Sequence, residues 1–269
     1  KGLLRAARAI ASVRDAGRSG VEVPENIQVD FPKVMERMRR LRAEISRHDS
    51  ATRFTELGVD VFIGQGEFEG ADIVRVGESR LRFKRAVIAT GARAAAISIP
   101  GLESVEFLTN ESLFSLTELP KRMAVIGAGP IGSEMAQAFA RFGSQVSLFE
   151  TQSHILSRED SAAAKIVKDS LRRDGVEILT LADIQKVRQD SGSKVLAFQH
   201  SGELQERQVD QILVGVGRAP NVEGLNLEAV GVDYDPRTGV TVDDRLRTTN
   251  KRIYAAGGIC FPYKFTHTA

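Results

Sequence analysis

The stretch MAVIGAGPIG, at residues 123–132, joins four consecutive apolar residues to a turn that holds three glycines. An apolar run of this length, followed at once by glycine, is typical of a buried parallel strand. The residues after the turn carry apolar side chains at helical spacing, which predicts a helix with one buried face. That apolar stripe consists of Ile131, Met135, Ala138, Phe139 and Phe142. The sequence therefore predicts a strand, a tight turn and a helix in direct succession.

The three glycines of this turn have different predicted roles. Gly127 permits the tight turn, Gly129 removes the side chain that would block a pyrophosphate, and Gly132 lets the helix pack closely on the strand. Pro130 and Ile131 then begin the helix, whose unpaired N–H groups attract phosphate oxygens. A glycine-rich string alone is a weak signal, but this one stands between a predicted strand and a predicted helix. We therefore expect a dinucleotide-binding site.

A second apolar run, at residues 146–149, delivers Glu150 eighteen residues after Gly132. In a dinucleotide site, an acid near this position holds the ribose 2′-hydroxyl. A 2′-phosphate would meet the carboxylate, and a like-charge contact at roughly 4 Å and a dielectric constant of about 20 costs on the order of 4 kcal/mol. No lysine or arginine at residues 151–153 offsets that repulsion. Glu150 therefore predicts a preference for NAD, and the alternative is an ordinary strand–helix–strand unit with a solvated glutamate.

The composition is that of a globular protein long enough for two domains. Of the 269 residues, 42% are hydrophobic and 27% are charged, as in ordinary soluble domains. The 37 basic and 35 acidic residues nearly cancel, so charge gives no reason to expect nucleic acid or an anionic membrane as a partner. No apolar run approaches the roughly 20 residues of a membrane span. A single cysteine, Cys260, excludes an internal disulfide and fits a reducing compartment, so we expect a cytoplasmic protein.

The residues before the glycine turn change their pattern along the chain. Helical spacing predicts a helix over residues 2–16 and a second helix from about Asp30. The arginines of the second helix favour a solvated face over an RNA or phosphate surface. Residues 92–118 show little periodicity and form a predicted connector. Short alternating runs between Val59 and Ala89 predict antiparallel strands, and they include residues 59–63, 73–76 and 81–83.

The residues after Glu150 continue an α/β pattern. Asp160 or Ser161 caps a predicted helix that stops at Gly175. The apolar stripe of this helix is Ala163, Ile166, Val167 and Leu171. Further strands are predicted at residues 176–179, 184–187, 195–198 and 212–217. We therefore expect an α/β fold in which a Rossmann-like domain surrounds a central parallel sheet.

Four separated motifs resemble those of the flavin-dependent pyridine nucleotide-disulfide oxidoreductases, the family of dihydrolipoyl dehydrogenase, glutathione reductase and mercuric reductase. The motifs are Ala89-Thr90-Gly91, the GAGPIG turn with Glu134, Gly217-Arg218-Ala219-Pro220-Asn221, and Tyr254-Ala255-Ala256-Gly257-Gly258. Their order and spacing match the family over the whole chain, and the mercuric-reductase-like branch is the most similar. The resemblance implies NAD and FAD as cofactors and a homodimer for the intact protein.

The same resemblance implies a division of the chain into three segments. Residues 1–118 would form part of an FAD-binding domain, residues 119–222 the NAD-binding domain, and residues 223–269 the return to the FAD-binding domain. The opening Lys1-Gly2-Leu3-Leu4 resembles the segment that follows the redox cysteine pair of the family. The chain is therefore expected to begin just past that dithiol.

Two catalytic residues are implied by this match. Lys1 would lie near flavin N5 and pair with Glu134. Such a charge pair would stabilise the reduced flavin while the nicotinamide delivers hydride. The alternative for Glu134 is a glutamate in the first turn of a helix, where the helix dipole favours it.

The resemblance also implies cofactor contacts outside the glycine turn. Gly66 would lie near the flavin adenine, and Thr90 and Gly91 belong to a flavin-side motif. Gly217 and Ile184 would approach the NAD adenosine. The alternatives for these two residues are a turn glycine and a core residue.

Two departures from the family limit the expected activity. Gly258, in the last cofactor-binding motif, stands where the family has an aspartate that holds the flavin, and losing one charge-assisted hydrogen bond costs about 1.5–3 kcal/mol. The redox cysteine pair, the flavin glycine motif and the C-terminal dimer domain have no counterpart in this sequence. We expect a fragment of a mercuric-reductase-like flavoprotein that passes hydride from NADH to FAD and on to a dithiol or metal ion. The alternatives are dihydrolipoyl dehydrogenase and an NAD(H)-binding module without chemistry.

The remaining candidate residues are weak. His48, His154, His200 and His267 lack ligand spacing with one another or with Cys260, so no metal site is expected. A lone cysteine such as Cys260 is more often a packed thiol than a nucleophile.

Overall fold

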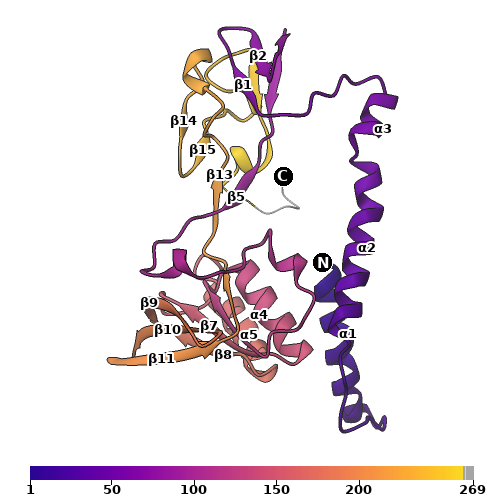
Figure 1. The fold of residues 1–269 in the computed structure, drawn as a ribbon, viewed down its shortest axis with the longest axis vertical. Coiled ribbons are helices and arrows are strands. Elements are labelled where there is room, and N and C mark those ends of the chain that lie inside the picture. Colours follow the sequence, from indigo (N-terminus) through magenta and orange to yellow (C-terminus); the bar gives the residue numbers. More distant parts are fainter. Residues whose placement is uncertain (263, 265–269) are drawn as a thin grey trace. The chain divides into compact units, whose positions relative to one another are not determined.

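The computed structural model describes residues 1–262 and residue 264. These residues form two compact units, each built from two separate parts of the chain (Figure 1). The first unit comprises residues 1–48 and 97–217. The second unit comprises residues 49–96 together with the described residues from 218 onward.

A four-stranded parallel sheet lies at the centre of the first unit. Met123, Ala124 and Val125 are fully buried, as their continuous apolar run predicts for a strand that is covered on both faces. The fold is therefore α/β and Rossmann-like, as expected. The strands follow the order β12-β6-β7-β8, with bounds Gln211–Val214, Arg122–Ile126, Gln145–Glu150 and Glu177–Thr180.

Alternate residues of the central strands enter two different cores. Val125 and Leu148 belong to a core that is shared with the helices. Ala124 and Phe149 belong to a core that is closed by an antiparallel sheet, where the rings of Phe149 and Phe198 meet edge to face at 4.9 Å. This second sheet has the order β11-β10-β9, with bounds Glu203–Val209, Ser193–His200 and Asp183–Asp190.

The two helices that follow the central strands begin and end at the residues that favour caps. Helix α4 spans Pro130–Phe142 and ends at Gly143, which has a left-handed φ of +116°. Helix α5 spans Ser161–Arg173, and the Asp160 carboxylate accepts hydrogen bonds from the first N–H groups of that helix. The sequence therefore placed both helices correctly.

The apolar stripe predicted for α5 is wrong at Ala163 and Ile166. Both residues are exposed, and 71% of Ile166 is accessible to solvent. The buried face passes instead through Ala164 and Leu171, which are seven residues apart and so share one side of the helix. No helix in the described part of the chain is both long and apolar enough to cross a membrane.

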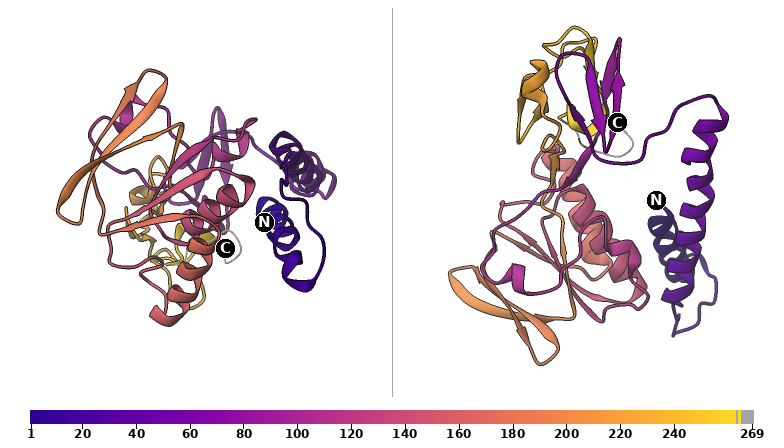
Figure 2. Two further views of the ribbon diagram at one scale, coloured as in Figure 1. Left: turned by 90° about the horizontal axis from the view of Figure 1, so that it is seen from below. Right: turned by 45° about the horizontal axis from the view of Figure 1, so that its top comes forward.

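The two N-terminal helices belong to the first unit. Helix α1 spans Gly2–Asp15 and packs against α4, and helix α2 spans Phe31–His48 (Figure 2). The Phe31 ring lies 5.7 Å from the ring of Phe139 and 5.8 Å from the ring of Phe142. Because these helices cover the apolar surface of α4, packing groups them with residues 97–217. The expected division into flavin- and NAD-binding segments at residue 118 stays a prediction.

The second unit consists of short strands and turns. The predicted strand at residues 59–63 is wrong: these residues lie outside any strand and their large apolar side chains are exposed, because no described strand pairs with them. Strands β1 (Gly66–Phe68), β2 (Ile73–Val76) and β3 (Ser79–Arg82) form an antiparallel sheet. The paired strands are β4 (Ala86–Ile88) with β16 (Ile253–Ala255), β5 (Ala92–Ala94) with β13 (Arg218–Pro220), and β14 (Tyr234–Asp235) with β15 (Gly239–Val240).

Short helical segments complete the two units. They are helix α3 (Ala51–Glu56) and the 3₁₀ turns at Ala16–Ser19, Leu102–Ser104, Leu113–Ser115, Leu227–Val230 and Gly257–Ile259.

Candidate dinucleotide-binding site

The glycines between β6 and α4 are subject to different constraints. Gly127 has a φ of +95°, and a Cβ atom there would come within 2.7 Å of the Gly215 carbonyl oxygen. A Cβ atom on Gly132 would overlap the Gly127 carbonyl oxygen. Gly129 is different, because its φ is −70° and a Cβ atom would meet no heavy atom within 4 Å. Since nothing in the described residues requires a glycine at position 129, its presence points to the close approach of a ligand.

The first turn of α4 offers N–H groups that no side chain caps. Gly129 is the N-cap residue, and Pro130 occupies the first turn. The first helical hydrogen bond runs from the Ser133 N–H to the Gly129 carbonyl oxygen at 2.9 Å. The N–H groups of Ile131 and Gly132 precede this bond and therefore lack an intrahelical acceptor. Together with the helix dipole they form an anion site that suits the phosphates of a dinucleotide.

Two backbone N–H groups fix the Glu150 carboxylate beside the same turn. Its Oε2 atom accepts from the Ala128 N–H and its Oε1 atom accepts from the Gln152 N–H, both at 2.9 Å. The Ala128 carbonyl oxygen accepts from the Leu156 N–H at 2.9 Å. The carboxylate is therefore oriented at the carboxyl end of β7, where its remaining lone pairs can accept from a ribose hydroxyl. Sequence reasoning missed Ala128, because a contact through the backbone leaves no side-chain signal.

Lys1 and Glu134 do not form the expected charge pair. Both residues are described and both are exposed, and no ion pair joins them. Their helices α1 and α4 do pack against each other, so the apolar contact forms without the charge contact. Their role toward a flavin remains a prediction.

The positions of Ile184 and Gly217 fit both the contact with the NAD adenosine that the resemblance implies and the alternatives of a core residue and a turn glycine. Ile184 is half-buried on β9, opposite Phe198 in the antiparallel ladder, and it packs against the second core. Gly217 is exposed and has a φ of +120°. The sequence did not single out Gly215, although a Cβ atom there would lie 3.5 Å from Gly132 Cα. The end of β12 therefore approaches the glycine turn through its backbone.

In the second unit, the motif at residues 89–91 is hydrogen-bonded to the motif at residues 217–221. Thr90 Oγ1 donates to the Asn221 carbonyl oxygen at 3.0 Å, and Asn221 Nδ2 donates to the Thr90 carbonyl oxygen at 2.8 Å. The Asn221 N–H donates to the Gly91 carbonyl oxygen at 3.0 Å. These bonds extend the pairing of β5 with β13, which gives both motifs a structural role.

The other flavin-side candidates are Gly66, which begins β1, and Gly258. The Gly258 carbonyl oxygen accepts from Lys264 Nζ at 3.0 Å, and burial lowers the pKa of the Lys264 ammonium. A Cβ atom on Gly258 would lie 3.4 Å from Ala92 Cβ. This position therefore offers a closely packed glycine and a nearby amine instead of the carboxylate that the family resemblance implies, and its fit to FAD is incomplete.

The remaining polar candidates do not gather into a site. Burial raises the pKa of the Cys260 thiol, which disfavours the reactive thiolate. Within the described residues, no three histidine, cysteine, aspartate or glutamate side chains are placed to hold a metal ion. His267 lies outside the described residues.

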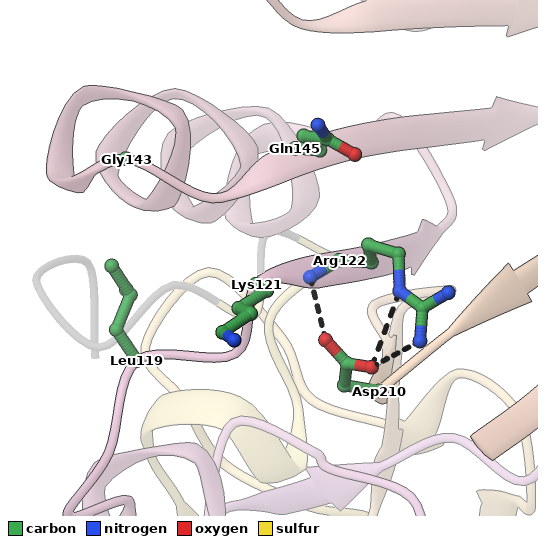
Figure 3. A pocket seen from close by; sticks show the side chains of 6 residues that line it. All are labelled: Leu119, Lys121, Arg122, Gly143, Gln145 and Asp210. Carbon is green, nitrogen blue, oxygen red and sulfur yellow. Dashed lines mark hydrogen bonds and ion pairs between the residues drawn. The ribbon is translucent and has the colours of Figure 1, made fainter.

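A hollow of about 410 Å³ lies at the amino ends of the parallel strands, opposite the edge that carries the glycine turn (Figure 3). In it, the Asp210 carboxylate pairs with the Arg122 guanidinium at 2.6 Å and accepts from the Arg122 N–H at 2.8 Å. Because Asp210 and Arg122 pair with each other, we interpret this ion pair as a brace between β6 and the start of β12. The residues that line the hollow are Leu119, Lys121, Arg122, Gly143, Gln145 and Asp210.

Replacing Asp210 with asparagine should lower the free energy of unfolding by about 1 kcal/mol at neutral pH, because the pair is about one-third exposed and partly screened. Burial alone would raise the pKa of the Asp210 carboxyl, but the hydrogen bonds from Arg122 outweigh burial and lower it. A depressed carboxyl pKa stabilises the fold above the unfolded value of about 4, and this contribution disappears as the pH falls through the folded value. Denaturant titrations at several pH values should therefore show the difference shrinking in acid.

The matched control is Asp169→Asn, which removes an exposed helix pair with Lys165 and should leave the stability almost unchanged, because exposed ion pairs contribute little. A difference between the wild-type chain and Asp210→Asn that stays constant down to about pH 2 would contradict the assignment.

Comparison with known proteins shows the family to which this chain belongs. The family model described as pyridine nucleotide-disulphide oxidoreductase matches residues 6–269. The chain belongs to this family. Among the relatives of this chain, the mercuric reductase of Bacillus cereus is 32% identical over 241 residues, which cover 90% of this chain and 38% of that protein. The dihydrolipoyl dehydrogenase of Geobacillus stearothermophilus is 32% identical over 268 residues, which cover 96% of this chain and 55% of that protein.

A solved structure is also similar to this chain. It is the Cu(II) complex of the HOCl-induced flavoprotein disulfide reductase RclA from Escherichia coli, with a TM-score of 0.82 and 27% sequence identity. The match covers 97% of this chain and 57% of that one. FAD and NAD(P) are accordingly the expected cofactors. The chain spans about half the length of the curated relatives it matches.

Proposed function

We propose that this chain binds NADH at the glycine turn between β6 and α4, and that it serves hydride transfer to FAD in the intact protein. The observation that carries the proposal is the open position at Gly129, beside the fixed carboxylate of Glu150. The N–H groups of Ile131 and Gly132 would hold the pyrophosphate, and Glu150 would orient the adenosine ribose. The nicotinamide supplies the hydride when the coenzyme is bound.

The same site is proposed to prefer NADH over NADPH. Glu150 keeps its carboxylate at the carboxyl end of β7 through two N–H donors, so the charge is not free to swing away from a 2′-phosphate. Residues 151–153 bring no cation to the same place. Repulsion between the carboxylate and a 2′-phosphate therefore supports selection against NADPH.

Replacing Glu150 with glutamine should narrow the ratio of NADH to NADPH affinity by about tenfold, equivalent to about 1.4 kcal/mol. The amide oxygen can still accept from the Ala128 N–H, whereas the bond from the Gln152 N–H is lost, so the variant keeps one of the two anchors while the negative charge is removed. Calorimetric titration of the wild-type and Glu150→Gln chains with both coenzymes measures the change.

The control for this experiment is Glu159→Gln, which removes an exposed charge further along the same connection. It should leave both affinities unchanged. Equal affinity of the wild-type chain for NADH and NADPH would show that Glu150 does not select the coenzyme.

We propose that the intact protein belongs to the mercuric-reductase-like branch, with mercuric ion as the final electron acceptor. The proposal is supported by 32% identity to a mercuric reductase over 90% of the chain. Dihydrolipoyl dehydrogenase is the alternative in the same family, since it is equally identical over a similar length. Oxidation of NADH by the intact protein, measured with mercuric ion and separately with lipoamide, distinguishes them. Turnover with lipoamide alone would overturn the mercuric assignment.

A second candidate function is an NAD(H)-binding module without chemistry. The observation that favours it is Gly258, because the Lys264 amine donates to its carbonyl oxygen and this position carries a glycine in place of a carboxylate. The visible spectrum of the purified chain separates the two functions. A yellow preparation that NADH bleaches supports hydride transfer, whereas a colourless preparation that binds NADH supports the binding module.

A further inference from the structure

The carboxyl edge of the parallel sheet carries an exposed leucine next to the proposed coenzyme site. Leu181 directly follows β8, the strand beside β7, and its neighbour Thr180 pairs with Glu150 in the parallel register. The Leu181 N–H donates to the Gln152 carbonyl oxygen at 3.1 Å, and the Ala182 N–H donates to the Glu150 carbonyl oxygen at 3.0 Å. The backbone of Leu181 is therefore fixed beside the acid proposed to hold the adenosine ribose.

Two properties of Leu181 are unfavourable for the stability of the chain when no ligand is bound. Its φ is +54°, in the left-handed region that glycine and asparagine occupy more readily than leucine. It is also 66% exposed, so its side chain obtains little compensating burial from the chain. Asparagine or glycine at position 181 would avoid both the unfavourable φ and the exposed apolar side chain, but the sequence has leucine there.

The other left-handed leucine of the first unit provides a comparison. Leu156 has a φ of +52°, but it is half-buried and packs against the helical core. Packing therefore accounts for a leucine at position 156. No such contact with the described residues accounts for Leu181, which is 66% exposed, and this difference points to a ligand that covers its side chain.

We propose that Leu181 forms an apolar platform for the adenine base of the bound dinucleotide. This inference rests on the proposed function, because the base must extend past β7 from a ribose that Glu150 holds. Ligands of open α/β sheets lie across the carboxyl ends of the strands, which places the adenosine half toward β8 in the order β6-β7-β8. A flat purine face can bury the exposed leucine surface there.

The test replaces Leu181 with asparagine in the full chain and measures coenzyme binding and stability separately. The affinities for NADH and for ADP-ribose should each fall about tenfold, because apolar contact with the base is lost. Reduced nicotinamide mononucleotide, which lacks the base, should compete equally well against both proteins. The thermal midpoint without coenzyme should rise by about 2–4 °C, because the left-handed conformation is relieved.

The opposite signs of these two changes separate a ligand contact from a structural role, since a merely structural leucine would not weaken binding while stability rises. The matched control is Leu204→Asn, which removes a leucine that is 71% exposed on β11 and should leave binding unchanged. If the wild-type chain binds NADH and Leu181→Asn binds it equally well, the platform is wrong and the proposed function stands. If the folded wild-type chain binds neither NADH nor ADP-ribose, both are overturned.

Discussion

Replacing Gly132 with alanine should lower the free energy of unfolding of the first unit by about 3 kcal/mol. A Cβ atom at this position would overlap the carbonyl oxygen of Gly127, which is backbone and cannot rotate away as a flexible side chain could. Either α4 must move off β6 or the turn must open, and both changes loosen the core around Val125 and Phe139. Denaturant unfolding of the two proteins, followed by far-ultraviolet circular dichroism, measures the loss.

The matched control lies in the same turn. Gly129→Ala adds the same methyl group where nothing lies within 4 Å and where φ is −70°, so stability should change by less than about 0.5 kcal/mol. If Gly132→Ala is as stable as Gly129→Ala, the close approach of helix and strand described for this turn is wrong.

Replacing Gly129 with valine should reduce the affinity for NADH about a hundredfold, equivalent to about 2.7 kcal/mol, while the chain remains folded. The position is extended and open, so the branched side chain fits the empty protein. It would, however, occupy the space in which a pyrophosphate approaches the N–H groups of Ile131 and Gly132. Calorimetric titration with NADH measures the affinity, and a thermal scan of the same sample confirms folding.

Gly17→Val provides the control for this loss of affinity. Gly17 is also an open glycine of the first unit, with no Cβ neighbour within 4 Å, but it lies in the turn after α1. NADH binding should be unchanged in this variant. Unaltered NADH affinity in a folded Gly129→Val chain would show that the coenzyme does not use the glycine turn.

Features that depend on neighbouring residues in the chain could be predicted from the sequence. The strand before Gly127, the helix after Pro130 and the cap at Asp160 follow from apolar spacing, glycine conformation and side-chain hydrogen bonding. The position of Glu150 at the end of β7 follows from the length of the strand–helix–strand unit. These signals are local, so the order of the elements is enough to place them.

Features that depend on distant partners could not be predicted in the same way. Residues 59–63 alternate like a strand, yet a strand also needs a neighbour to pair with, and none is present among the described residues. The burial of Phe31 depends on Phe139 and Phe142, more than a hundred residues away. The anchoring of Glu150 by the Ala128 N–H involves the backbone alone.

The residues at 89–91 illustrate a second limit of prediction from the sequence. Thr90 and Gly91 were expected to mark a cofactor site, and the structure shows that both are also hydrogen-bonded to Asn221, beside the pairing of β5 with β13. A motif can therefore be retained for its structural bonds as well as for a ligand. The two roles can be separated only by measuring binding and stability independently.

Titration of the isotope-labelled chain with NADH, followed through its backbone amide signals, tests the central claim most directly. The account predicts that the amide signals of Gly129, Ile131 and Gly132 shift most and saturate together, because these groups would meet the pyrophosphate. NADPH should produce the same pattern only at higher concentration. Saturable NADH binding that leaves these three amides unchanged, or an absence of binding in a folded sample, would contradict the account.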